Sequence, residues 1–145
     1  RIPMKPLYTF LLLFTITIAL GQNTKSYLYK GTIDGKMPVT MYLESEDNGC
    51  TPQLVYKGMY KYDKLSNWLQ LEITSNDKGQ FIFTEYQFSG VLILQKTKEG
   101  FNGIWISPDT KRQLKVVLKK AALSTKDIQL YEDRYEKLNY SNYDC

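Results

Sequence analysis

The chain of 145 residues contains no histidine. Histidine is the usual general base near neutral pH, the usual partner of a catalytic serine or cysteine, and the commonest ligand of zinc and copper. Its absence excludes Ser-His-Asp and Cys-His hydrolases and most zinc and copper sites. We therefore expect a protein without enzymatic activity, cofactor or metal.

Cysteine is almost as scarce, because only Cys50 and Cys145 are present. Without a histidine to activate its thiol, Cys50 is a poor candidate for a nucleophile. An oxidising compartment would permit a disulfide between the two cysteines. Their positions in the sequence do not show whether they lie within bridging distance. A bridge and a structural thiol are both open at this stage.

Neither sign of charge dominates the composition. Lysine and arginine total 19, aspartate and glutamate total 15, and the formal net charge is +4. Arg1 and Lys5 lie in the N-terminal segment, and the other basic residues are interspersed with acids. Nucleic-acid binding needs a basic patch or stripe, and membrane anchoring by charge needs a polybasic cluster. We therefore expect no nucleic-acid partner.

Residues 1–21 have the layout of a secretory signal peptide. A basic start at residues 4–6 (MKP) precedes an apolar run over residues 7–20, and residues 19–21 (ALG) form a cleavage-like triplet. The run is shorter than the ~20 residues that span a bilayer. We expect Met4 to be the true start and cleavage to leave no membrane anchor. The pattern predicts an exported protein, periplasmic or extracellular.

Residues 22–123 are predicted to form one all-β domain. Short alternating apolar runs are separated by turn signals such as Asp34-Gly35, which suits a tight hairpin. Consecutive strands joined by short turns predict an antiparallel eight-stranded meander, either an up-and-down barrel or a curved sandwich. The expected strands cover residues 27–33, 39–43, 53–62, 68–74, 80–86, 91–96, 101–107 and 114–118.

Residues 124–145 are predicted to form a short C-terminal helix and a loose tail. Apolar side chains recur there at helical spacing, with Ser124 or Thr125 as the cap and Asp127 in the first turn. We expect the tail to begin after Asn139. The helix is expected to cover a sheet edge or to plug one end of the domain.

Several segments of the strands combine glycine with aromatic residues. They are residues 29–33 (YKGTI), 39–43 (VTMYL), 58–62 (GMYKY), 84–85 (TE) and 101–105 (FNGIW). In this order they resemble the exported β-meander domains of Bacteroidota envelope proteins. The last strand departs from that pattern, because Leu114 and Val116 replace the closing aromatic residue. The resemblance implies a periplasmic or secreted location and brings no catalytic residues.

Four aromatic residues, Tyr56, Tyr60, Tyr62 and Trp68, are the main candidates for a ligand site. Alternate residues of a strand share a face, so the three tyrosines form a row. The row would either belong to the core or form a platform for sugar rings or a partner's side chains, since such rings combine apolar area with a polar tip.

Acidic residues suggest two further candidates. Glu44, Glu46 and Asp47 are expected in a polar loop that could enter a basic enzyme's active site, although the spacing does not match a calcium-binding EF-hand. Glu72 and Glu85 lie on adjacent predicted strands and are the least implausible pair for a carboxylate-based hydrolase.

These observations favour a non-catalytic exported binding or interaction domain. Its partner would be a protein, a glycan or a small apolar ligand. One alternative is a lipocalin-like carrier, which requires an internal cavity. Another is an inhibitor of an envelope-attacking enzyme such as lysozyme, an analogy of size, location and fold.

Overall fold

A computed structural model describes residues 23–144, so the expected signal peptide and Cys145 lie outside the described residues. The described chain forms eight strands, a short 3-10 turn (Tyr86–Phe88) and one long helix. These are β1 (Lys25–Ile33), β2 (Met37–Asp47), β3 (Leu54–Tyr62), β4 (Leu69–Ser75), β5 (Gln80–Glu85), β6 (Val91–Lys96), β7 (Gly100–Ile106), β8 (Gln113–Ala121) and α1 (Thr125–Tyr143).

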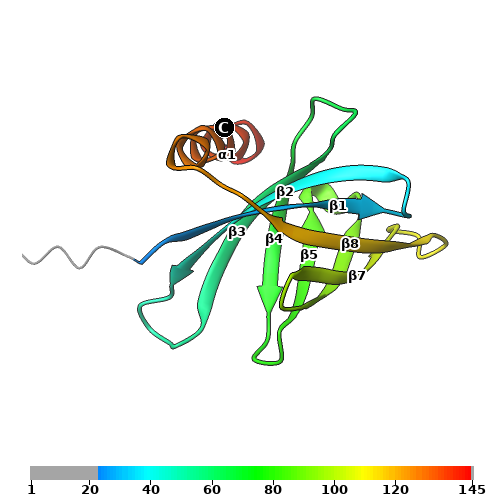
Figure 1. The fold of residues 1–145 in the computed structure, drawn as a ribbon, viewed down its shortest axis with the longest axis horizontal. Coiled ribbons are helices and arrows are strands. Elements are labelled where there is room, and N and C mark those ends of the chain that lie inside the picture. Colours follow the sequence, from blue (N-terminus) through cyan, green and yellow to red (C-terminus); the bar gives the residue numbers. More distant parts are fainter. Residues whose placement is uncertain (1–22, 145) are drawn as a thin grey trace, which may run out of the picture.

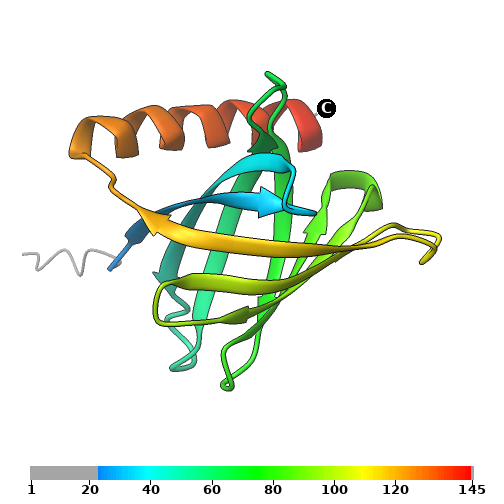
Figure 2. The same cartoon turned by 45° about the vertical axis from the view of Figure 1, so that its right-hand side comes forward.

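The strands form a closed up-and-down barrel (Figures 1 and 2). Each strand pairs antiparallel with the next, and β8 pairs with β1 from Leu28 opposite Ala121 to Ile33 opposite Val116. The meander prediction is confirmed, and closure selects the barrel over the curved sandwich. Closure also gives both β1 and β8 a hydrogen-bonded neighbour on each side, which removes the open edges of the sheet.

Large apolar side chains fill the barrel because alternate residues of every strand point inward. Phe101 makes edge-to-face contacts with Phe81, Phe83 and Tyr29, with ring centroids 5.0–5.7 Å apart. Trp105 belongs to the same core, as the sequence predicted for it and Phe101. The most deeply buried side chains of this interior include Ile33, Met41, Leu43, Phe83, Leu92, Leu94 and Leu118.

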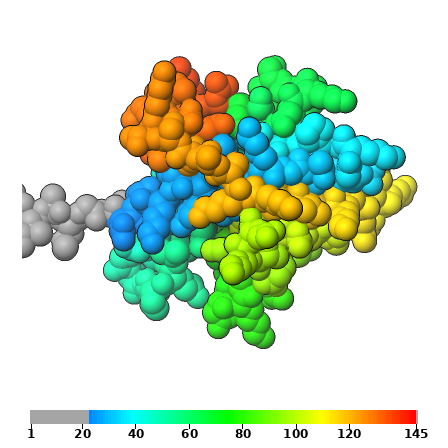
Figure 3. Space-filling view, viewed as in Figure 1, coloured from blue at the N-terminus to red at the C-terminus, as the bar shows by residue number. Residues whose placement is uncertain are grey.

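The helix α1 lies across the outer wall of the barrel, where Figure 3 shows it in orange and red against the first strands. It neither covers a sheet edge nor plugs an end, so both expected placements are wrong. Tyr42 and Met59 point outward yet are fully buried, because Tyr131, Tyr135 and Leu138 of α1 pack over them. The Tyr42 and Tyr131 rings stack 5.0 Å apart.

The helix begins as the sequence predicted and ends later. Ser124 accepts a hydrogen bond from the Asp127 backbone in a reciprocal capping box. The expected loose tail after Asn139 is helical to Tyr143, because the last turns are tied to the barrel wall. Gln70 donates to Asn139 (2.6 Å) and accepts from Asn142 (2.7 Å).

Candidate functional site

The predicted row of tyrosines is real, and it lies inside the barrel. Tyr60 is fully buried, while Tyr56 and Tyr62 are partly buried toward opposite ends of β3. Trp68 does not belong to this row. It precedes β4 and packs outside the barrel, edge-to-face with Tyr131 at 5.8 Å. The row is therefore mainly core, with Tyr62 and Tyr56 each lining a pocket at opposite ends of the barrel.

A buried carboxylate occupies the interior beside Tyr60. Glu85, the last residue of β5, is 4% exposed and accepts hydrogen bonds from the Tyr60 hydroxyl, the Trp105 indole N–H (2.7 Å) and the Ser89 hydroxyl (2.6 Å). Burial, followed by the negative charge of Glu85, raises the pKa of Tyr60 far above its usual value. The phenol therefore stays protonated and donates. Glu85 joins β3, β5 and β7.

Glu72 and Glu85 do not form a catalytic pair. In the β4–β5 register Leu71 faces Glu85, while Glu72 faces Thr84. Neighbouring residues of a strand point to opposite faces, so Glu85 is inside the barrel and Glu72 is outside, within reach of the Tyr143 hydroxyl (3.3 Å). The two carboxylates do not share a cleft, so the least favoured hypothesis from the sequence, a carboxylate-based hydrolase, lacks the pair it needs.

A pocket of about 380 Å³ opens at the end of the barrel nearest Glu85. Tyr62 connects it to the interior, with ring centroids of Tyr62 and Tyr60 5.7 Å apart. The Arg112 guanidinium lies 5.3 Å from the centroid of the Trp105 ring. The pocket, called here the mouth pocket, is lined by Lys36, Met37, Pro38, Tyr62, Lys64, Leu65 and Arg112.

The cations of the mouth pocket form no ion pair among the described residues, although the Ser107 hydroxyl and, more weakly, Arg112 lower the pKa of the exposed Asp109 carboxyl. Within residues 23–144 every ion pair involves Lys57, on the outer wall of the barrel. Lys36, Lys64 and Arg112 therefore bring positive charge to a pocket whose lining contains no acid. Such a pocket favours an anionic group, and Met37, Pro38 and Leu65 provide apolar contacts beside it.

The prediction from the sequence did not include these three cations, although their positions in the connections between strands are a signal for them. Lys36, Lys64 and Arg112 lie in or beside the connections β1–β2, β3–β4 and β7–β8. In an up-and-down meander every second connection returns to the same end of the barrel. Grouping the turns by this rule would have placed the three side chains around one mouth.

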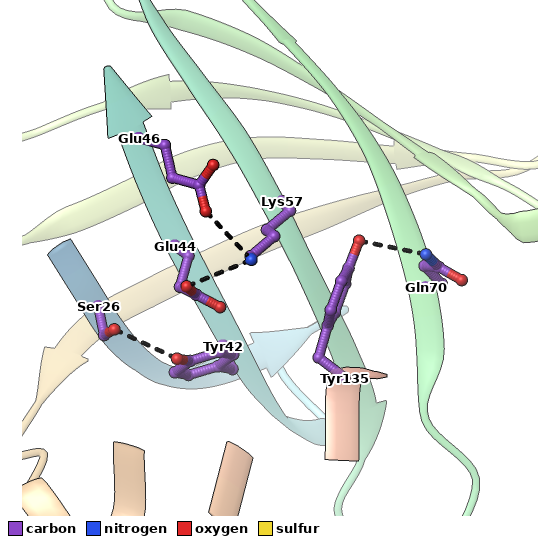
Figure 4. A network of polar contacts seen from close by, with 7 residues as sticks. All are labelled: Ser26, Tyr42, Glu44, Glu46, Lys57, Gln70 and Tyr135. Carbon is purple, nitrogen blue, oxygen red and sulfur yellow. Dashed lines mark hydrogen bonds and ion pairs between the residues drawn. The ribbon is translucent and has the colours of Figure 1, made fainter. Parts of the chain in front are cut away.

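The acidic residues predicted to form a loop belong to a strand instead. Glu44, Glu46 and Asp47 are in β2, and Glu44 is only 4% exposed. Lys57 of β3 lies 3.5 Å from the Glu44 carboxylate and 3.1 Å from that of Glu46 (Figure 4). Because β2 extends to Asp47 and Lys57 holds two of the three acids, the predicted protruding acidic loop is wrong.

Burial raises the pKa of Glu44, opposed by Lys57 and reinforced by Glu132 of α1. A raised carboxyl pKa means that folding favours the protonated form, so its contribution to stability is present below the unfolded pKa and is lost as pH rises through the folded pKa. We expect Glu44→Gln to be more stable than wild type at pH 7 by about 1 kcal/mol or less. The variant no longer buries the charge of Glu44, and Lys57 still has Glu46 as its ion-pair partner.

This advantage should shrink as pH falls from 7 through the raised pKa of Glu44 and vanish below the ordinary value of 4.5. Urea unfolding of both proteins at several pH values measures the difference. A difference that is constant with pH would mean that Glu44 does not titrate anomalously. Glu46→Gln is the matched control, since it removes the other partner of Lys57.

Only one of the two cysteines lies among the described residues. Cys50 is exposed in the β2–β3 connection, and Cys145 lies outside the described residues. The disulfide stays a prediction. Among residues 23–144 there is no group of three potential metal-binding side chains, and none of the helices there has the length and hydropathy of a membrane span.

Known proteins were compared with the chain at three levels. No family model, curated protein or solved structure matches it. The similarity to Bacteroidota envelope domains therefore stays an expectation from the sequence, and the function is inferred from the chemistry of the surface.

Proposed function

We propose that the chain is a non-catalytic exported binding domain that holds an anionic ligand in the mouth pocket. The observation that carries this proposal is the arrangement of Lys36, Lys64 and Arg112, none of which forms an ion pair within residues 23–144, around an apolar floor. A volume of about 380 Å³ lies in the range of small-molecule sites. A ligand with a carboxylate, sulfonate or phosphate on an apolar body would match both the cations and the apolar residues of the pocket.

The opposite mouth of the barrel provides a contrast. Its pocket of about 490 Å³ contains Tyr56 and Phe81, but only one lysine, Lys96, and one acid, Asp77. The lining of the mouth pocket is thus the more positive of the two. This asymmetry favours an anionic ligand at the Arg112 end over a nonspecific apolar ligand at either end.

The alternatives from the sequence receive less support. A lipocalin-like carrier holds its ligand inside the barrel, and here aromatic and aliphatic side chains fill that space. A lysozyme inhibitor was expected to act through the acidic loop, whose glutamates instead belong to β2. Export is proposed from residues 1–21, which lie outside the described residues, and from the resemblance to exported β-meander domains.

The mouth pocket can be tested with 8-anilinonaphthalene-1-sulfonate, an anionic aromatic probe whose fluorescence rises in apolar surroundings. We expect saturable binding that weakens with added salt, because the recognition is partly electrostatic. Arg112→Gln should raise the dissociation constant about fivefold or more, and Lys36→Gln should act in the same direction. Fluorescence titration of the folded variants measures the effect.

Lys78→Gln is the matched control, because Lys78 lies in the β4–β5 turn at the other end of the barrel. It removes the same charge and should leave the dissociation constant unchanged. Equal weakening by Lys78→Gln and Arg112→Gln would reduce the effect to net charge. Binding unchanged by Arg112→Gln, Lys36→Gln and salt would overturn the proposal.

A further inference from the structure

A second hollow lies between α1 and the outer wall of the barrel, called here the helix groove. It measures about 520 Å³ and runs along β1, β2 and β3 beneath the first turns of the helix. Its lining differs from that of the mouth pocket. Two aromatic residues, Trp68 and Tyr131, stand among hydroxyl and charged side chains, and Leu130 is the only aliphatic one.

Three cations of the helix groove have no ion-pair partner among residues 23–144. They are Lys30, Lys61 and Arg134. The ring of Trp68 positions two of them, because the Lys61 ammonium lies 5.5 Å and the Arg134 guanidinium 5.8 Å from its centroid. Cation–π contacts of this kind leave the hydrogen-bonding capacity of the charged group available.

Two acids lie in the same groove, and hydrogen bonds hold each of them in place. The Thr40 hydroxyl donates to Oδ1 of Asp63 (2.7 Å), and Ser124 donates to Oδ2 of Asp127 (2.7 Å). In the described chain the second carboxylate oxygen of each has no protein donor. Because these oxygens only accept hydrogen bonds when ionised, they suit ligand hydroxyl groups.

The presence of both cations and acids in the helix groove distinguishes between classes of anionic ligand. Acidic peptides and DNA strands offer few hydroxyl donors, so Asp63 and Asp127 would repel their negative charges without accepting hydrogen bonds in return. An acidic saccharide presents carboxylates or sulfates for the cations and hydroxyls for the two aspartates. Its C–H faces can also contact aromatic rings, which combine apolar area with polar tips.

We propose that the helix groove is a second binding site, for a saccharide that carries carboxylate or sulfate groups. Arg134 and Lys61 bind the acidic group, and Asp63 accepts hydrogen bonds from ring hydroxyls. This site is separate from the mouth pocket, since the β3–β4 connection, residues 63–68, lies between them. The two sites can therefore be tested one at a time.

The probe is trigalacturonate, compared with its methyl ester, which keeps the hydroxyls and loses the charge. Isothermal titration of the folded protein should show binding of the acid and at least about fivefold weaker binding of the ester. Arg134→Gln should weaken the binding of trigalacturonate by about the same factor. Arg112→Gln, at the mouth pocket, is the control and should leave it unchanged.

Asp63→Asn gives a test by sign. The amide keeps the shape of the side chain and its bond with Thr40, while it removes a negative charge. For the saccharide, loss of an ionised acceptor should weaken binding about threefold or more. For hexaglutamate or a short oligothymidylate, loss of repulsion should strengthen binding. Circular dichroism confirms that the variant is folded.

Weaker trigalacturonate binding in both Asp63→Asn and Arg134→Gln would support the acidic-saccharide site. Stronger binding of hexaglutamate or oligothymidylate than of trigalacturonate would overturn it in favour of a peptide or nucleic acid. No heat of binding for trigalacturonate or a sulfated disaccharide at millimolar concentration would also overturn it. Neither result would bear on the mouth pocket, whose probe and variants are different.

Discussion

Replacement of Glu85 by alanine is expected to lower the free energy of unfolding by about 3–4 kcal/mol. The variant would leave the Tyr60 hydroxyl and the Trp105 indole N–H buried without an acceptor. Each unsatisfied buried donor costs about 1–3 kcal/mol. Relief from burying the Glu85 charge offsets part of this. For domains whose total stability is about 5–15 kcal/mol, the remaining loss is large.

Glu85→Gln separates the hydrogen bonds from the charge. The amide oxygen can accept from Tyr60 and Trp105. The Ser89 hydroxyl, which donates to the carboxylate in the wild type, can instead accept a hydrogen bond from the amide N–H. We expect a loss of about 1–2 kcal/mol, because bonds to a neutral acceptor are weaker than bonds to a carboxylate. Urea unfolding followed by tryptophan fluorescence measures both variants.

Glu72→Ala is the matched control for this series. Glu72 lies on the adjacent strand and faces outward, with one 3.3 Å contact to Tyr143. Its removal should change the free energy of unfolding by about 0.5 kcal/mol or less, as for most surface substitutions. Similar losses for Glu72→Ala and Glu85→Ala would show that Glu85 does not organise the barrel interior.

Replacement of Gly31 by alanine is expected to destabilise the closing seam of the barrel by about 3 kcal/mol. Gly31 of β1 faces Leu118 of β8 in the pairing that closes the sheet. A methyl group on Gly31 would overlap the carbonyl of Val117, which is backbone and cannot rotate away. The strands must therefore separate locally or the ladder must shift.

Hydrogen exchange provides the specific measurement, since the amides of β8 should lose protection more than those of β5 in Gly31→Ala. The matched control is Gly35→Ala, at a position with φ +64° and open space around it. That variant carries the cost of a left-handed backbone conformation, about 1–2 kcal/mol, without a clash. A Gly31→Ala protein as stable as Gly35→Ala would contradict the close approach at the seam.

The faces of the strands were predictable because they depend on neighbours in the sequence. Alternation of apolar residues placed Tyr56, Tyr60 and Tyr62 on one face, and the sixth strand spans residues 91–96 as predicted. The start of the helix at Ser124 was equally local, since a cap and its partner lie three residues apart. Such features need no knowledge of the rest of the fold.

The candidate sites were less predictable, because they combine residues that are distant in the sequence. Glu44 reads as a loop acid until β2 is seen to extend past it and Lys57 of β3 to pair with it. Trp68 was grouped with the three tyrosines as a ligand-site candidate, but the chain between β3 and β4 places it outside the barrel. The cations of each pocket come from three separate elements.

The sequence by itself determined the all-β meander, which residues of a strand share a face, and the start of the helix at Ser124 or Thr125. Tertiary structure decided that β1 and β8 close the sheet, that α1 lies on the outer wall and extends to Tyr143, and which charges stay unpaired. The physical reason is range. Periodicity and capping act within a few residues, whereas closure, helix docking and pocket formation depend on contacts between segments far apart along the chain.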